Sequence, residues 1–247
     1  MVPLAGVDPQ TAYLVTASVT DASGRTVVGQ RPMAGFVSVP RAKSPIAPDG
    51  AMAEADWKRA PVLAINEARQ YFSFDTAKIK WKDAADLSGT VRFLWDDKYL
   101  YVGVKVTDDV FANTKADGDL WAGDGLQFMV DPARGEAAMV GKYDIGAAVT
   151  KKGPQAWCFM SADPRAPAGE AREILVSGTR GDRGDMTYVV AIPWSRVAPF
   201  KPAVGANLGM CVTMNEDDGP GRAAFMTWFG DVQSKRVDTV GDLILGE

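Results

Sequence analysis

Histidine is absent from the sequence, and its absence excludes several kinds of chemistry. Without an imidazole the chain cannot build a Ser-His-Asp or Cys-His nucleophile, a His-ligated zinc site or a histidine general base. Carboxylate chemistry and calcium or magnesium held by oxygen ligands remain. A pair of carboxylates that cleaves a glycosidic bond must face each other across it, and no sequence pattern here indicates such a pair. We therefore expect a protein that is not an enzyme.

The sequence also lacks an excess of positive charge and any long apolar run. It has 27 Lys and Arg against 31 Asp and Glu, a formal net charge of -4. Nucleic acids and anionic membranes attract basic patches, so neither is an expected partner. No apolar stretch reaches the length of a membrane span. The opening MVPLAGVDPQ lacks the basic start and apolar stretch of a signal peptide and resembles the start of a segment cut from a longer protein.

Cysteine is scarce, with Cys158 and Cys211 as the two examples. Both fall inside expected strands, and a disulfide would require those strands to be neighbours. The sequence favours buried free thiols over a disulfide.

Short segments of alternating apolar residues are abundant. In TVRFLWDDKYLYVGVKVTDD, Val91, Phe93 and Trp95 share one face of a first strand, and residues 100–106 form a second after a DDK turn. Many short strands at this spacing are typical of a β-sandwich or barrel. We expect short helical turns at 54–57 and in PWSRVAPF, and further strands near 126–131, 143–149, 156–160, 173–178, 187–192, 208–214, 223–228 and 242–245.

The chain divides into two expected parts. Residues 1–40 contain alternating strands around the turn DASGR and predict a β-hairpin segment. A lone hairpin is marginal in water, so we expect it to dock on the main domain or to be the tail of a preceding β domain. A stiff linker with Pro40, Pro45 and Pro48 leads into the main domain, residues 41–247.

Acid pairs occur at several expected turns. Calcium takes carboxylate and carbonyl oxygens from loops, so these pairs are candidate ligands of a structural calcium ion. The alternative is turn chemistry, because Asp accepts hydrogen bonds from its own backbone in tight turns. The candidate metal ligands are Asp108, Asp109, Asp217 and Asp218.

Trp121 has an unusual setting, the Gly- and Asp-rich stretch DLWAGDGLQFMVD at 119–131. An indole offers an apolar face on which the CH face of a pyranose can stack, and sugar hydroxyls require planar polar partners. Gln127 points away from the apolar face of the strand that follows and suits that role. The alternative is that Trp121 plugs the edge of the core.

Five stretches occur in order between about Ile46 and Leu245, with VGDLIL at the end: DGAMAEADW, VRFLWDDKYLYVGVKVTDD, LWAGDGLQFMVDP, YVVAIPWSRV and GMCVTMNEDDGPGRAAFMTW. Together they resemble the family 9 carbohydrate-binding modules. The resemblance implies an all-β fold, an antiparallel β-sandwich of two packed sheets that binds a polysaccharide or oligosaccharide without catalysis. Members commonly accompany a neighbouring catalytic domain that acts on polysaccharides, which implies a secreted, periplasmic or cell-surface protein. Structural calcium is common in the family.

The resemblance also assigns sugar contacts, and the sequence departs from the family at two of them. Neither the second aromatic wall expected in GDVQSKRVDTVG nor the arginine expected near KYDIGAAV is present, and Gly146 and Ala147 occupy the latter region. Another wall is then expected from Phe111, Tyr143 or the N-terminal hairpin. The candidate sugar-binding residues are Trp121, Gln127, Arg222, Asp124 and Tyr143.

Two alternatives to sugar binding remain open. The missing aromatic wall favours a structural domain of the same fold that has lost its sugar site and contacts a neighbouring domain. The related DOMON-type domains bind haem, for which Met129, Met139 or Met160 would serve as one axial ligand. With no histidine the second ligand would have to be Met or Lys, so haem is not expected.

Overall fold

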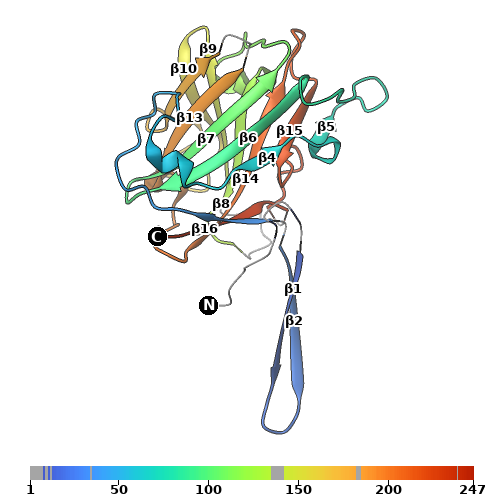
Figure 1. Cartoon of the computed structure of the whole chain (residues 1–247), viewed down its shortest axis with the longest axis vertical. Helices are drawn as coiled ribbons and strands as arrows, with labels where there is room; N and C mark the ends of the chain where they lie inside the picture. Colours follow the sequence, from blue (N-terminus) through green and yellow to red (C-terminus); the bar gives the residue numbers. More distant parts are fainter. Residues whose placement is uncertain are drawn as a thin grey trace.

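The chain folds into a two-layer sandwich of β-sheets with a hairpin that projects from one end (Figure 1). This computed structural model describes residues 8, 11, 13–33, 35–134, 142–181, 185–237 and 239–247. The expected all-β antiparallel sandwich is confirmed, with one parallel pair, β3 with β16.

The larger sheet has nine strands, and most of its length is the path β11-β10-β9-β8-β14-β15-β5. β16 pairs with the start of β14 and carries β3 on its other side. Its members are β3 (Phe36–Val39), β5 (Tyr71–Ser73), β8 (Gly125–Asp131), β9 (Tyr143–Thr150), β10 (Gly153–Met160), β11 (Gly169–Glu170), β14 (Asn207–Glu216), β15 (Ala224–Trp228) and β16 (Gly241–Leu245).

The second sheet has five strands in the order β12-β13-β7-β6-β4. Four 3-10 turns lie between strands in the described ranges, and two of them are the helical turns expected from the sequence. The strands are β4 (Leu63–Ile65), β6 (Leu87–Trp95), β7 (Tyr99–Asp108), β12 (Leu175–Arg180) and β13 (Met186–Pro193), and the turns are η1 (Ala55–Lys58), η2 (Ala68–Gln70), η3 (Asp117–Ala122) and η4 (Trp194–Val197).

The main core lies between the two sheets. Alternation along each strand directs one set of side chains inward, so Phe93 and Val102 of the smaller sheet meet Phe128 and Trp228 of the larger. The rings of Phe93 and Trp228 lie 5.8 Å apart. At about 25 cal/mol per Å² of apolar surface removed from water, this inward set supplies the main stabilisation of the fold.

The outer face of the larger sheet is only partly covered. Residues 229–237 and 239–240 cover part of it, where Val232, Val237 and Val240 pack on Met129 and Cys211. Further toward β9, β10 and β15, this outer face carries polar and aromatic side chains. Both cysteines are buried free thiols, as the sequence favoured.

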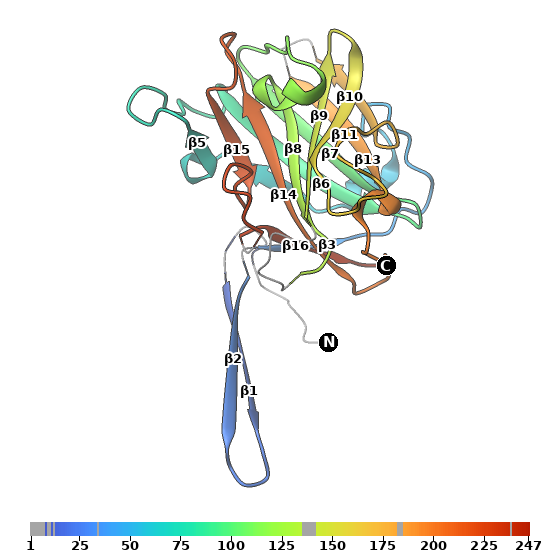
Figure 2. The same cartoon turned by 180° about the vertical axis from the view of Figure 1, so that it is seen from behind.

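The hairpin consists of β1 (Tyr13–Thr20) and β2 (Thr26–Met33), which pair with each other. Figures 1 and 2 both show it extending away from the sandwich, and Leu14, Val19 and Val27 are exposed. Its membership of a preceding β domain stays a prediction.

The sandwich domain, expected to begin at residue 41, also includes the strand before that residue, β3. β3 pairs with β16, and Val37 and Val39 lie in the main core, so β3 belongs to the sandwich. The proline-containing segment that follows packs through Ile46 on the outer face of the smaller sheet, beside Trp57. In the described part of the chain, every helix is too short to span a bilayer.

Candidate functional site

A hydrogen-bonded group of polar side chains lies on the outer face of the larger sheet. Along β8, Leu126, Phe128 and Val130 point into the core, so Gln127 faces outward. The Gln127 amide donates to the carboxylate of Asp144 on β9 at 2.8 Å. Gln127 Oε1 accepts from Arg222 at 3.0 Å, and Asn215 Oδ1 on β14 accepts from the same guanidinium nitrogen at 2.9 Å.

Arg222 lies in the loop that joins β14 and β15. Its guanidinium carbon is 5.3 Å from the ring of Trp121, 4.9 Å from that of Phe74 and 5.2 Å from that of Phe225. Burial among these groups lowers the pKa of Arg222 to about 10, so the side chain is still charged at neutral pH. Its backbone N–H donates to Ala122 O at 2.8 Å, which ties this loop to the 3-10 turn that carries Trp121.

Trp121 itself is exposed to solvent. It lies in η3, where Leu120 is buried and anchors the turn, and its own side chain is 41% exposed. An indole that plugged the core would be buried, so the core-plug alternative is wrong. The sequence suggested an irregular loop at this point, whereas the residues form a 3-10 turn.

These groups line a cavity of about 440 Å³. Lys235, from the segment that folds back over the sheet, forms an ion pair with Asp144 at one side of it. The cavity is open to solvent and combines two aromatic rings with amide, carboxylate and cationic groups, which suits a small polar ligand with apolar faces. Its lining residues are Trp121, Gln127, Asp144, Phe159, Met160, Arg222 and Lys235.

Phe159 is a second aromatic ring in the cavity, and the sequence analysis missed it. The register of β10 against β9 shifts between Cys158 and Met160, which places a β-bulge at Phe159, and bulges redirect side chains. A Cβ atom at Gly146 would lie 2.8 Å from the ring of Phe159. The glycine found where the family resemblance led us to expect an arginine therefore makes room for this ring.

The predicted sugar contacts divide into two groups. Trp121, Gln127 and Arg222 come together at the cavity, although they are distant in sequence. Asp124 does not line it: this carboxylate is buried behind η3, where it accepts hydrogen bonds from the backbone N–H groups of Ala112 and Asp217.

Tyr143 requires a correction. Its ring is fully buried in the main core and its hydroxyl donates to Ala198 O, so it cannot contact a sugar at this surface. Alternation in β9 explains the error, because Tyr143 points inward and the next residue, Asp144, points into the cavity. Phe111, another suggested wall, lies outside the cavity lining and has Arg180 over its ring at 5.1 Å.

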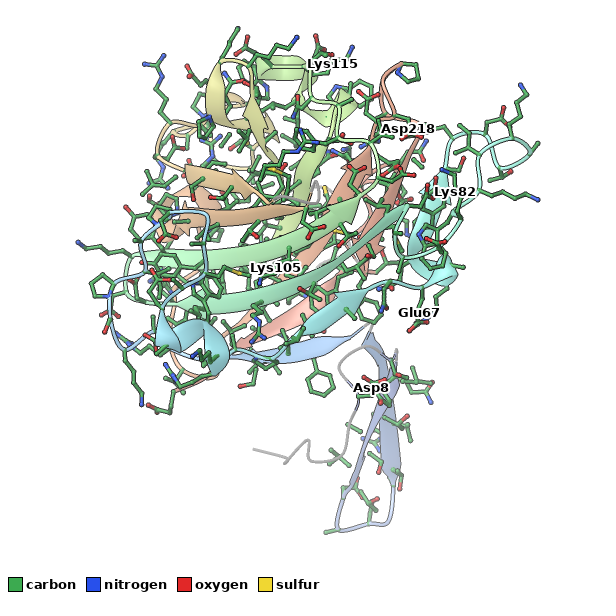
Figure 3. The ribbon with its side chains drawn as sticks, turned by 45° about the horizontal axis from the view of Figure 1, so that its top comes forward. Asp8, Glu67, Lys82, Lys105, Lys115 and Asp218 are labelled. Carbon is green, nitrogen blue, oxygen red and sulfur yellow. The ribbon has the colours of Figure 1, made fainter. Side chains whose placement is uncertain are left out.

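Two groups of carboxylates converge near the ends of β7 and β14. Oxygens of Asp108, Asp124 and Glu216 lie within 4.8 Å of one another, as do those of Asp86, Asp109 and Glu216. Lys82 pairs with Asp86 at 2.9 Å and with Asp109 at 3.5 Å. Figure 3 shows Lys82 and Asp218 at the same end of the molecule.

Burial raises the pKa values of Asp108, Asp124 and Glu216, and repulsion between neighbouring carboxylates adds to the effect. The pKa of Asp108 rises to about 6, that of Asp124 to about 8 and that of Glu216 to about 9. Within the described structure, Glu216 Oε2 is buried without a hydrogen-bond partner. Calcium prefers carboxylate oxygens as ligands. Because several carboxylate oxygens converge here and one of them has no hydrogen-bond partner, these residues fit a calcium ion.

The predicted metal ligands match these groups in part. Asp108 belongs to one and Asp109 to the other, whereas Asp86, Asp124 and Glu216 were missed. Asp217 and Asp218 lie nearby but are outside both groups. Asp217 Oδ1 accepts from the backbone N–H groups of Gly219 and Gly221 at 2.8 and 2.7 Å, which is the turn chemistry considered as the alternative.

Two of the three methionines considered as haem ligands lie in the described part of the chain. Met129 is fully buried under the segment that folds back over the sheet, and Met160 lines the cavity. Met139 lies outside the described residues.

Comparison with known proteins identifies the same fold. A family model described as "Carbohydrate family 9 binding domain-like" matches residues 49–245. Similar solved structures include a family 9 carbohydrate-binding module from Caldicellulosiruptor kristjanssonii in complex with cellotriose (TM-score 0.61, 17% identity, 85% of this chain and 93% of that one). A complex of such a module with glucose, from the same organism, gives a TM-score of 0.60 at 16% identity over 86% and 96% of the two chains. Among curated proteins, no match was found.

Proposed function

Because the chain belongs to the family 9 carbohydrate-binding domains, by its match over residues 49–245, we propose that its cavity binds a saccharide by stacking on Trp121. The observation that carries this proposal is the exposed indole beside the half-buried, charged Arg222 and the amide of Gln127. The ring supplies an apolar face, and the polar groups supply donors and acceptors for hydroxyls. The similar structures contain cellotriose and glucose, which makes neutral glucans the first ligands to test.

The polar side chains in the cavity are held in place by hydrogen bonds and an ion pair. The Gln127 amide is oriented by Asp144 on one side and Arg222 on the other, so its flip state is fixed by the network. Lys235 compensates the charge of Asp144. A set of donors and acceptors held by its own hydrogen bonds loses little side-chain freedom when a ligand binds. These groups bind and orient a sugar, and we assign no reaction to them.

The expected result for Trp121→Ala is a loss of saccharide affinity without unfolding. One stacked ring contributes about 1–3 kcal/mol by analogy with bases stacked on aromatic side chains, so affinity should fall by a factor between about 5 and about 150. Isothermal titration with glucose and cellotriose measures this, and Trp121→Phe is the matched control that keeps an aromatic face and most of the affinity. Unchanged affinity in Trp121→Ala would remove the basis of the proposal.

A panel of polysaccharides in affinity electrophoresis distinguishes this proposal from the structural-domain alternative. Sugar binding predicts retardation by at least one glycan, and a domain that has lost its site predicts none. Phe159 favours sugar binding, since a second ring in the cavity takes the place of the aromatic that is missing from the sequence GDVQSKRVDTVG, residues 230–241.

We also propose that the converging carboxylates hold a structural calcium ion. Asp108, Asp124 and Glu216 would hold it, and the ion would neutralise carboxylates that repel one another. Binding to the folded state alone stabilises it by about 2.7 kcal/mol when free calcium is one hundred times Kd. The melting temperature in calcium and in a chelator measures this effect.

The setting of the module is a further proposal. A secreted, periplasmic or cell-surface location and a neighbouring catalytic domain in the same polypeptide follow from the usual role of such modules. Fractionation of the native host cells with an antibody against this chain, and mass determination of the captured polypeptide, test both.

A further inference from the structure

The exposed aromatic rings of the described chain are gathered in one place. Phe72, Phe74 and Trp121 are 39%, 45% and 41% exposed, and all other described aromatic side chains are buried or half-buried. A scatter of single exposed rings would need no explanation, but clustering of large apolar groups at one surface indicates a binding region.

Arg222 joins these rings into a continuous surface. Its guanidinium carbon lies 4.9 Å from the ring of Phe74 and 5.3 Å from that of Trp121. Beneath them Phe225 is fully buried and stacks on Phe72, with centroids 5.2 Å apart and planes 12° from parallel. We call the surface formed by Trp121, Arg222, Phe74 and Phe72 the aromatic strip.

The aromatic strip runs across the strands, away from the cavity. Phe72 lies in β5, and Phe74 follows directly after that strand. β5 is the last strand of the sheet path β8-β14-β15-β5, where Phe72 pairs with Phe225 of β15. Figure 2 shows β8, β14, β15 and β5 in this order. Neighbouring strands are about 4.8 Å apart, so the strip adds the width of several strands to the site.

We propose that the aromatic strip is a second saccharide subsite, which holds further pyranose units of a linear chain whose end or neighbouring unit occupies the cavity. The inference rests on the proposed function and deepens it, because it names an extended oligosaccharide as the ligand. The strip and the cavity share Trp121 and Arg222, so a ligand that leaves the cavity past Trp121 meets the strip.

The chemistry of the strip suits a neutral, extended chain of pyranoses. Phenyl rings can stack on the CH faces of successive units and have no polar atoms to read their hydroxyls. Arg222, between the rings, is half-buried, and its guanidinium is a hydrogen-bond donor that a sugar oxygen can approach from the solvent side of the strip.

The test compares ligand lengths. Hexasaccharides of linear gluco-, xylo-, manno- and galacto- series are screened first, and the one that binds is titrated beside its monomer and trimer by calorimetry. In the wild-type chain, affinity should rise at least about tenfold from monomer to hexamer. In Phe72→Ala/Phe74→Ala this rise should disappear while affinity for the monomer changes less than about twofold.

Controls separate the strip from the cavity and from the fold. Leu175→Ala, an exposed apolar residue on the other sheet, should leave every affinity unchanged. Phe74→Ala alone leaves the stack of Phe72 on Phe225 in place and should remove part of the length dependence. Trp121→Ala should weaken monomer and hexamer alike.

The outcomes distinguish the two proposals. Equal affinity for monomer and hexamer, or a length dependence that persists in the double variant, overturns the aromatic strip and leaves sugar binding in the cavity intact. Absence of binding by the whole panel overturns the proposed function and the strip with it.

Discussion

Single residues determine the character of the cavity, and Gly146 is the clearest case. Its lack of a side chain lets Phe159 lie over β9, and the bulge in β10 turns Phe159 toward the cavity. In the sequence analysis, this glycine stood where the family resemblance led us to expect an arginine. In the structure, the space at Gly146 is occupied by the ring of Phe159, so an aromatic contact takes the place of the expected cationic one.

Substitution at Gly146 should therefore act through Phe159. In Gly146→Ala the new Cβ would lie 2.8 Å from the ring, so the ring must shift and saccharide affinity should fall, by less than the roughly tenfold loss expected for Phe159→Ala. Titration with the same saccharide measures both. Gly181→Ala is the matched control, since its Cβ would be 3.6 Å from its nearest neighbour. Equal affinities in all three variants would contradict a contact by Phe159.

At the scale of elements, the loop between β14 and β15 links the cavity and the carboxylate groups. Glu216 ends β14 and belongs to both groups, while Arg222, six residues later, reaches the cavity. Asp124 Oδ1 accepts the backbone N–H of Asp217 at 2.7 Å, which fixes the start of this loop. A calcium ion at the carboxylates would hold the loop that positions Arg222.

The raised pKa values of three carboxyl groups predict how the free energy of unfolding depends on pH. Their pKa values in the folded state, about 6, 8 and 9 for Asp108, Asp124 and Glu216, exceed the unfolded values of about 4. The folded state therefore binds more protons, and without calcium the free energy of unfolding should fall as pH rises from about 5 to 8.

Calcium should reverse this trend. The ion takes the place of the bound protons, so its stabilisation should be larger at pH 8 than at pH 5. Denaturant titrations at both pH values, with calcium or with a chelator, measure the difference. Glu216→Gln should reduce it, whereas Asp75→Asn, an acid outside both carboxylate groups, should not. A calcium effect of equal size at both pH values would argue against these ligands.

At the scale of the whole molecule, the sandwich begins at β3. Val37 and Val39 are buried in the main core and β3 pairs with β16, whereas β1 and β2 pair with each other. The hairpin thus adds length to the molecule without adding to the core between the sheets.

Two truncations test this boundary. A chain that starts at Gly35 should keep the melting temperature within about 2 °C, since the hairpin side chains described are mostly exposed. A chain that starts at Arg41 loses two buried valines, worth about 1.5–3 kcal/mol each, and should melt roughly 10 °C lower. Thermal unfolding followed by circular dichroism compares them. A large loss in the first truncation would show that the hairpin supports the sandwich.

The sequence alone determined the architecture and three members of the site. Alternation of apolar residues placed the strands. The local sequence picked out Trp121 and Gln127, the family resemblance picked out Arg222, and the fold brings these three side chains together at the cavity. Only the tertiary structure showed that Asp144 faces the cavity while Tyr143 faces the core, and that Phe159 supplies the second aromatic ring of the cavity. It also showed which carboxylates lie close together at the ends of β7 and β14. These outcomes depend on the register of strands distant in the sequence, and a shift of one residue exchanges the two faces of a strand. Local pattern contains no information on that register.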